Sequence, residues 1–492
     1  MLVDELIELA HAVERTKTEG QTMEVKKALE GCPHNLYDTL SSFSNQDTGG
    51  VILFGLDEDA GFAICGVYDA HDLQKKVTEQ CNQMEPPVRA VFTHAEIEGK
   101  MVCSAEIPGL DISERPCYYK GAGRLRGTYI RVGDADLHMT DYELNSLEAF
   151  RRHAHDDIRP IESADMSLLD GDQLSVYVHL RRAERPGFSR LSIEQAYEML
   201  NITKGKAPTL AALLNFGLYP QGYFPQLAIT AVVVPGTSIG ITTEDHARFL
   251  DNKRLEGTLV NMLDEAMAFC LRNMKTRTII DPATGKRADQ TEYPLLAIRE
   301  AVLNALIHRD YSPYTEGTPI QINFFSDRLE IHSPGTLYGR MTVEQLGIAR
   351  PDLRNPALAV MAETLLKAEN RYSGIPTIRN EMAKAGLPPP VFENRRNEFV
   401  VTLYNHAGDA PTTTKSENAL AGFCAVPRTR QEIAGFLGIG VTPYMMNQYV
   451  HPLLEKGILK MTLPDKPKSR NQKYYAPHEM TERRQQYDHR SL

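Results

Sequence analysis

A glutamate and an asparagine lie one helical turn apart in residues 300–311, whose sequence is EAVLNALIHRDY. Alanine, leucine and glutamate favour helices, and neither glycine nor proline interrupts the stretch, so it is predicted to be helical. Glu300, Asn304 and His308 then share one face, while the remaining positions are apolar enough to be buried. A buried glutamate and asparagine need polar partners, which are either neighbouring backbone groups or a bound ligand. We interpret His308 as structural.

Those two side chains have the chemistry that a nucleotide and its metal require. An asparagine carbonyl is a hard oxygen ligand for Mg²⁺, and a glutamate one turn earlier can orient or deprotonate an attacking water. Further along, Gly335 and Gly374 lie in predicted turns where backbone N–H groups can approach phosphate closely. The segment SGIPTIRNEM around Gly374 also leads into a helix N-terminus, which favours anions. Glu300, Asn304, Gly335 and Gly374 therefore suit the phosphates of a nucleotide together with Mg²⁺, with Asn304 as metal ligand.

A second set of acids lies near the N-terminus. Glu19 and Glu24 are five residues apart, and Lys26 shares a strand face with Glu24. Asp57 and Asp59 follow in a turn, DEDAG, after a buried strand. Converging carboxylates could hold Mg²⁺ or Mn²⁺ for phosphodiester hydrolysis, with Glu19, Glu24 and Asp57 as ligands and Lys26 neutralising developing charge. The choice between Asp57 and Asp59 stays open, as does the alternative that these acids are ordinary turn residues.

Two basic segments are candidates for nucleic-acid binding. PCYYKGAGRLRGTYIR, residues 116–131, interleaves tyrosines with Lys120, Arg124, Arg126 and Arg131 and contains no acid. Such a surface can hold phosphates and stack bases, unless it is only a solvated strand face. Near the C-terminus, Thr429 and Glu432 form a capping box, and a second helix is expected at 443–451. This unit resembles a winged helix-turn-helix, which implies base contacts from Asn447 and Gln448 and phosphate contacts from a wing, with Lys466, Lys468, Arg470 and Lys473.

The composition limits the alternatives. The chain has 492 residues, so several domains are expected, and its net charge of −10 confines nucleic-acid binding to local patches. Seven scattered cysteines without CxxC spacing favour reduced thiols in the cytoplasm. No apolar run is long enough to cross a bilayer, and no signal peptide is evident, so no membrane partner is expected.

Longer segments resemble known families. Residues 14–143, with FSNQDTGG, PCYYKG and YIRVGD, resemble the AlbA-2 domain shared with Schlafen proteins. That resemblance implies that Glu19, Glu24 and one aspartate are the acids of a nuclease site. Four segments within 250–405, including REAVLNALIHRDYS and NRYSGIPTIRNEM, resemble the divergent GHKL-type ATPase module of RecG-like and AlbA-2 regulators. This second resemblance implies that Glu300 is the catalytic carboxylate and Asn304 the Mg²⁺ ligand. It also implies that Gly335 belongs to the adenine-side turn and Gly374 to the phosphate lid.

The chain departs from the ATPase pattern in two places. No aspartate for the adenine amine is evident in HSPGTLYG, and Tyr372 occupies a position where the lid usually has glycine. These departures favour nucleotide binding over turnover. We expect an α+β multidomain protein: an AlbA-2/Schlafen-like domain at 1–150, a mixed connecting segment at 151–250, a Bergerat-like α/β-sandwich ATPase module at 251–408, a linker at 409–424 and a winged helix at 425–492.

Two functions follow as hypotheses. In the first, the protein is an ATP-binding, DNA-binding transcription regulator, whose nucleotide state controls assembly or DNA contact. In the second, it is a Schlafen-like metal-dependent endonuclease for RNA or DNA, gated by nucleotide and serving antiphage defence. DNA is favoured over RNA as the partner, and a homodimer is expected by analogy with related ATPase folds.

Overall fold

The computed structural model describes residues 1–280, 287–366 and 373–405; beyond these it describes 420, 423–424, 427–437, 446, 450–455, 458–462 and 472–476. The chain divides into two compact units. The first contains Met1–Arg159 together with two short distant segments, Tyr338–Arg340 and Asp352–Pro356. The second contains Pro160–Leu337, Met341–Pro351 and Ala357–Leu492.

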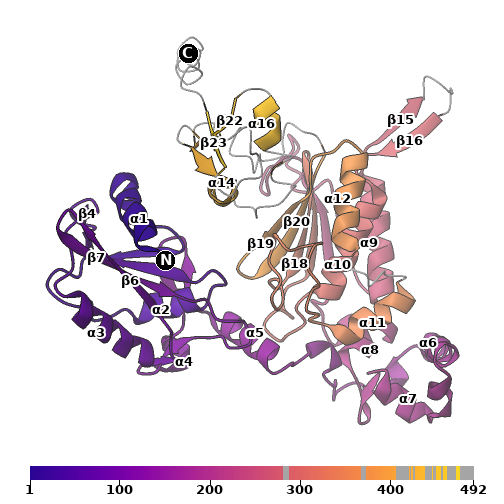
Figure 1. The fold of residues 1–492 in the computed structure, drawn as a ribbon. Helices are drawn as coiled ribbons and strands as arrows, with labels where there is room; N and C mark the ends of the chain where they lie inside the picture. Colours follow the sequence, from indigo (N-terminus) through magenta and orange to yellow (C-terminus); the bar gives the residue numbers. More distant parts are fainter. Residues whose placement is uncertain are drawn as a thin grey trace. The chain divides into compact units, whose positions relative to one another are not determined.

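The first unit, drawn mostly in indigo to purple in Figure 1, is built on a four-stranded mixed sheet. The strand order is β1-β2-β7-β6. Strands β1 and β2 are parallel, with Glu24 opposite Ile52, and the other pairs are antiparallel. The elements are α1 Val3–Thr16, β1 Met23–Lys26, α2 Tyr37–Ser44, β2 Gly50–Phe54, β3 Leu56–Asp57, β4 Ala63–Ile64, α3 Ala70–Asn82, β5 Met84–Glu85, β6 Val91–Ile97, β7 Lys100–Ile107, β8 Tyr118–Tyr119, α4 Gly123–Arg126, β9 Tyr129–Val132, β10 Ala135–His138, α5 Asp141–Arg151 and the 3-10 turn Asp156–Ile158.

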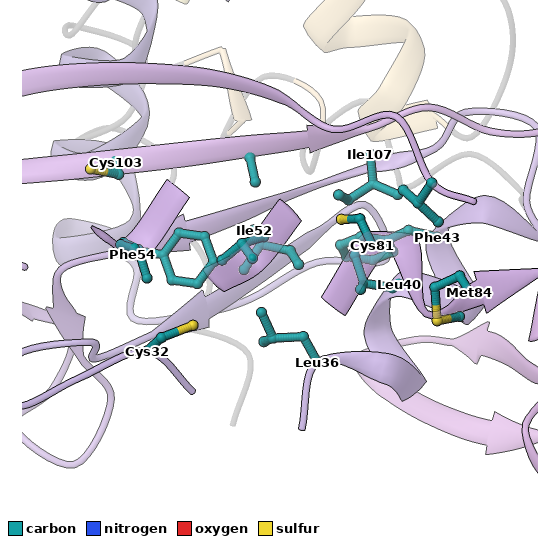
Figure 2. Packing of buried hydrophobic residues seen from close by; sticks show 14 of the residues in the cluster. Cys32, Leu36, Leu40, Phe43, Ile52, Phe54, Cys81, Met84, Cys103 and Ile107 are labelled. Atoms are coloured by element: carbon teal, nitrogen blue, oxygen red, sulfur yellow. The ribbon is translucent and has the colours of Figure 1, made fainter. Parts of the chain in front are cut away.

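The main core of this unit lies between the sheet and helices α2 and α3. Leu36, Leu40 and Phe43 pack with Ile52 and Phe54 of β2, and Figure 2 shows these side chains together with Cys32, Cys81 and Cys103. Burial of free cysteine as a small apolar group is common. All seven cysteines of the chain are unpaired with one another, and six of them are buried.

The second unit contains a six-stranded mixed sheet in the order β14-β13-β17-β18-β20-β19. Its elements up to Tyr404 are the 3-10 turn Met166–Leu168, α6 Gly171–Glu184, the 3-10 turn Pro186–Arg190, α7 Ile193–Met199, β11 Thr203–Lys204, β12 Ala207–Pro208, α8 Leu210–Phe216, the 3-10 turn Pro220–Gly222, β13 Ile229–Val233, β14 Asp251–Leu255, α9 Leu259–Asn273, β15 Thr276–Ile280, β16 Arg287–Thr291, α10 Leu295–His308, β17 Ile320–Phe324, β18 Arg328–Pro334, α11 Pro356–Leu365, α12 Gly374–Lys384, β19 Val391–Asn394 and β20 Glu398–Tyr404.

Helices α9, α10 and α12 cover one face of this sheet (Figure 1). Strands β13 and β17 are parallel, so the chain between them crosses over through α9 and α10, as parallel pairing requires. Helix α10 is buried on most sides, through Ala297, Ile298, Ala301, Val302, Leu303, Ala305, Leu306 and Ile307. The predicted buried helix is thereby observed, and the expected α+β multidomain class is confirmed.

The described C-terminal residues form a three-stranded sheet with two helices. The elements are β21 Arg428–Thr429, α14 Arg430–Leu437, α16 His451–Glu455, β22 Lys460–Met461 and β23 Lys473–Tyr475, with sheet order β21-β23-β22. The capping box is present, since the Thr429 backbone N–H donates to Glu432 Oε2 and the Glu432 N–H donates to Thr429 Oγ1. The winged helix stays a prediction, because most of 443–451 and 464–473 lies outside the described residues. Over the described parts of the chain, no helix has both the length and the apolar character needed to span a membrane.

Candidate nucleotide and carboxylate sites

Glu19 and Glu24 meet at the start of β1, together with two cations. The backbone N–H of Val25 donates to Glu19 Oε1 at 2.7 Å, which brings the Glu19 carboxylate back onto the strand. Lys26 Nζ lies 2.5 Å from Glu24 Oε1, and Arg131 Nη2 lies 2.7 Å from Glu24 Oε2 and 3.9 Å from Glu19 Oε2. The structure therefore joins the two predicted glutamates and Lys26 in one cluster.

Arg131 is the centre of this cluster and not a surface residue. Its side chain is only 1% exposed and lies over the Phe43 ring, with 5.3 Å between the guanidinium carbon and the ring centroid. Its second guanidinium nitrogen, Nη1, lies 3.0 Å from Asp136 Oδ1, and Asp136 is its direct cross-strand neighbour in the β9–β10 hairpin. Its guanidinium is therefore buried against carboxylates and not on an open surface, and its contact with nucleic acid stays a prediction.

Burial and charge act against each other in this cluster. Burial, and next the charge of Glu24, raise the pKa of Glu19 above its ordinary value. Burial alone would lower the pKa of Lys26, but its hydrogen bond to Glu24 and the neighbouring carboxylates raise it. Asp38, which sequence reasoning passed over, also has a raised pKa, from burial and from the charge of Asp136.

Asp57 and Asp59, the two candidates for the third acid, lie at the end of β3 and in the turn that follows it. Asp57 Oδ2 lies 2.7 Å from Lys27 Nζ, which lowers the pKa of Asp57, and Asp59 is exposed in the following turn. Glu58, which was not selected from sequence, is the acid of that turn whose charge acts on Glu19. Over the described residues, no three His, Cys, Asp or Glu side chains gather as a metal-binding group. Glu19 and Glu24 therefore meet each other, but Asp57 pairs with a lysine.

The remaining residues of the basic segment are more accessible. Lys120 Nζ lies 3.2 Å from Glu85, with both side chains about half exposed, and Arg124 Nη1 lies 2.8 Å from Glu148. Arg126 is exposed at the end of α4. Of the tyrosines, Tyr119 stacks on Tyr37 with 3.8 Å between ring centroids, so this ring already has an intramolecular partner. Lys120, Arg124 and Arg126 form what we call the basic patch.

In the second unit, Glu300 and Asn304 lie against the N-terminus of α12. A Cβ atom added to Gly374 would lie 3.1 Å from Asn304 Nδ2 and 3.2 Å from Glu300 Oε2. Only glycine gives this close approach without displacing the two side chains. Glu300 Oε1 lies 3.3 Å from Arg299, which also donates to the Leu366 carbonyl. His308 is exposed at the end of α10, and Tyr372 lies outside the described residues.

Gly335 lies at the end of β18, beside the C-terminal end of α10. Its φ of +104° is unfavourable for residues with a side chain, and an added Cβ would lie 2.4 Å from Asp310 Cβ. Its N–H donates to the Asn397 carbonyl, and Ser333 Oγ donates to the Ala305 carbonyl of α10. The turn predicted at Gly335 is therefore packed directly against α10. Asp310, a buried acid that sequence reasoning did not select, borders it.

Most of the C-terminal candidate residues lie outside the residues that the structure describes. Lys473 lies exposed on β23. Asn447, Gln448, Lys466, Lys468 and Arg470 lie outside the described residues, so their predicted contacts with nucleic acid stay predictions.

Three family models match separate parts of the chain. Residues 19–140 match "Schlafen, AlbA_2", and residues 317–403 match "Putative ATP-dependent DNA helicase recG C-terminal". Residues 421–475 match "Filamentation induced by cAMP protein Fic-like, C-terminal domain". The first match contains Glu19, Glu24 and Arg131, and the second contains Gly335 and Gly374.

Several solved structures match the chain, among them the following two. The DIP2311 protein from Corynebacterium diphtheriae is 18% identical, covers 97% of this chain and 98% of its own, and has a TM-score of 0.41. The N-terminal domain of a RecG-related protein from Nitrosomonas europaea is 23% identical and has a TM-score of 0.23. The match covers 27% of this chain and 93% of that domain. No curated protein matches the chain. The chain therefore combines a region that matches the Schlafen AlbA_2 family model with a region that matches the RecG C-terminal model.

Proposed function

We propose that this protein binds ATP with Mg²⁺ between α10 and α12 and binds nucleic acid through its N-terminal unit, with nucleotide state controlling its assembly or its contact with DNA. The coarser part, an ATP-dependent function associated with nucleic acids, rests on the AlbA_2 and RecG-type matches. The observation that carries the nucleotide site is the approach of Gly374 to Asn304 and Glu300. Transcription regulation is the role that best suits this combination of regions.

The residues at this site fit the proposed ligand. Asn304 offers an amide oxygen and Glu300 a carboxylate, which are the hard oxygen donors that Mg²⁺ prefers. Bound Mg²⁺ would neutralise phosphate charge. The N-terminus of α12 presents backbone N–H groups beside those two side chains, and helix N-termini favour phosphate. In this proposal, Glu300 orients or deprotonates a water molecule.

The test is nucleotide affinity of the full chain, measured by titration calorimetry with Mg²⁺ and ATP. Asn304→Ala removes the proposed metal ligand, so we expect at least a tenfold loss, or about 1.4 kcal/mol. Asn252→Ala, at an exposed position on β14, is the matched control and should bind as wild type does. Glu300→Gln should keep most of the affinity and abolish any ATP hydrolysis. Unchanged affinity in Asn304→Ala would remove the assignment.

The second candidate function is a metal-dependent endonuclease in the N-terminal unit. It is favoured by the meeting of Glu19 and Glu24 beside Lys26, and by the raised pKa of Glu19. Carboxylate oxygens suit Mg²⁺ or Mn²⁺, but Arg131 and Lys26 already balance Glu24. For this reason we place the regulator first.

Cleavage assays separate the two functions. Labelled RNA, single-stranded DNA and duplex DNA are incubated with the full chain and Mg²⁺ or Mn²⁺, with and without ATP. The regulator predicts binding without cleavage. Cleavage that is lost in Glu24→Ala but kept in Glu58→Ala would establish the endonuclease at this cluster, and cleavage that survives Glu24→Ala would place it elsewhere.

A further inference from the structure

Two short segments of the first unit come from a distant part of the sequence, within the proposed nucleotide-binding region. Tyr338–Arg340 and Asp352–Pro356 belong to the first unit, although the residues on both sides of each segment belong to the second. Both lie between β18, which ends at the Gly335 turn, and α11. We call residues 335–356 the coupling segment.

Within the first unit, the coupling segment is held by a two-nitrogen ion pair. Arg340 Nε lies 3.2 Å from Asp111 Oδ2, and its Nη2 lies 3.3 Å from Asp111 Oδ1. Charge-assisted pairs of this bidentate form are both stronger and more directional than single contacts. The same guanidinium lies 5.5 Å from the centroid of the Phe150 ring, and Tyr338 packs edge-on against that ring at 5.4 Å.

Asp111 lies in a loop that leads back to the carboxylate cluster. An added Cβ at Gly109 would lie 2.2 Å from the Gln46 carbonyl oxygen, and Arg115 Nη2 lies 2.5 Å from Asp47 Oδ1. The side-chain amide of Gln46 in turn donates to the Gln21 carbonyl, immediately before β1. These contacts connect the loop that carries Asp111 to the chain just before the strand that carries Glu24.

In the second unit, the coupling segment touches both sides of the proposed nucleotide site. At one end is the Gly335 turn beside α10, and next to it the Leu337 N–H donates to Asn394 Oδ1. In its middle, an added Cβ at Gly347 would lie 3.0 Å from Pro376 Cδ in the first turn of α12. The neighbouring Leu346 carbonyl accepts a hydrogen bond from Arg379 of α12 at 2.8 Å.

We infer that the coupling segment transmits nucleotide occupancy from α12 to the N-terminal unit through the Arg340–Asp111 ion pair. This inference rests on the proposed function, whose regulation it specifies. Because Gly374 is in contact with Glu300 and Asn304, phosphate and metal bound there displace the N-terminus of α12. That displacement moves Gly347 and Leu346, and the change reaches Arg340 along seven residues of chain. A nucleotide can change nucleic-acid affinity in this way only if the contacts of α12 differ between the nucleotide-bound and the nucleotide-free state.

The experiment measures the effect of nucleotide on nucleic-acid binding in the full chain. Affinities for fluorescein-labelled 20-mers of mixed sequence are measured by anisotropy, with and without the imido analogue of ATP and Mg²⁺. The 20-mers are single-stranded DNA, duplex DNA and RNA. We expect a change of about fivefold or more in wild type, which is the lower end of typical coupling. In Arg340→Gln the change should fall below about twofold, while nucleotide affinity itself stays near that of wild type.

Two matched variants test whether the ion pair is specific. Arg340→Lys keeps the charge but not the two-nitrogen geometry, so it should retain part of the coupling. Lys253→Gln removes another half-exposed ion pair, to Glu265, whose side-chain exposures of 44% and 43% are close to the 57% and 47% of Arg340 and Asp111. It should leave the coupling unchanged.

Hydrogen exchange gives a readout that needs no nucleic acid. The amides of residues 108–117 should change their protection when the ATP analogue binds to wild type, and should not change in Arg340→Gln. Wild type that binds nucleotide without altering this loop would overturn the inference alone, as would full coupling in Arg340→Gln. Wild type that binds no nucleotide would overturn the proposed function, and this inference would fall with it.

Discussion

The two acidic sites of this protein are built in opposite ways. At the start of β1, the carboxylates of Glu24 and Asp136 are neutralised by cations of the chain itself, the buried Arg131 and the partly exposed Lys26. On α10, Glu300 and Asn304 lie against Gly374 at the N-terminus of α12, where the helix backbone provides partial positive charge. In the first arrangement, cations of the chain itself already pair with the carboxylates. The second leaves its surroundings adapted to an anion, which is why we place the nucleotide there.

The largest expected effect comes from removing the central cation of the first site. Arg131→Met leaves Glu24 and Asp136 buried without their guanidinium, which should cost about 3–5 kcal/mol. Arg126→Met, at an exposed position on α4, should cost within about 0.5 kcal/mol. Urea unfolding combined with hydrogen exchange at β1 and β9 measures both. Equal costs for the two variants would show that the first site does not depend on its own cations.

A smaller effect is expected at the second site, where backbone geometry and not charge is decisive. Gly335→Val combines a φ of +104° with a Cβ placed 2.4 Å from Asp310 Cβ. Strain and overpacking together should cost about 2–4 kcal/mol and weaken nucleotide binding. The control Gly386→Val has a φ of +69° with open space around it, so only the strain of about 1–2 kcal/mol applies. Thermal unfolding and nucleotide titration measure both variants. Equal losses of stability and of nucleotide affinity in the two variants would contradict the role given to the Gly335 turn.

The smallest effect concerns pH and a third charged group, on β18 of the second unit. His332 Nε2 lies 3.0 Å from Glu330 and its Nδ1 lies 3.1 Å from Glu398. Burial alone would lower the pKa of His332, but these two carboxylates raise it. Because the pKa of His332 is raised in the folded state, protonated His332 stabilises the fold fully below about pH 6.5. This stabilisation is lost as the pH rises through the folded-state pKa.

Melting temperatures of the full chain between pH 6 and 8.5 measure this dependence. Wild type should lose stability over this range, and His332→Gln should flatten the part of the curve that His332 causes. The exposed His179 on α6 provides the control, because His179→Gln should keep the wild-type profile. An identical slope in His332→Gln would exclude this ion pair as the source.

Local patterns were sufficient to predict some of these features. Helix periodicity and glycine chemistry predicted a buried helix over 300–311, which is observed at Leu295–His308, together with the shared face of Glu300 and Asn304 and the turn at Gly335. Arg131 could not be placed in this way. In the strand YIRV the arginine is buried while Val132 is 53% exposed, which reverses the usual pattern. A signal was present in Asp136, five residues later at hairpin spacing, but only the folded register shows that the two are paired.

Contacts between distant parts of the chain were equally hidden. Gly374 was selected for its turn, yet its contact with Asn304 depends on how α12 packs on α10. Asp57 lies in an acidic turn that suits metal binding, but the neighbouring Lys27 takes its carboxylate. In both cases the deciding partner is set by tertiary packing, which no local spacing specifies.

The divided first unit has a consequence for how this protein is made. During synthesis, Arg159 emerges long before Asp352–Pro356, which belong to the same unit. At about 5–20 residues per second, the intervening stretch of about 200 residues takes roughly 10–40 s to synthesise. For that time Phe150 lacks Tyr338, and Asp111 lacks Arg340. The N-terminal unit therefore reaches its final form only after the proposed nucleotide-binding helix α10 has been synthesised, so the two regions mature together.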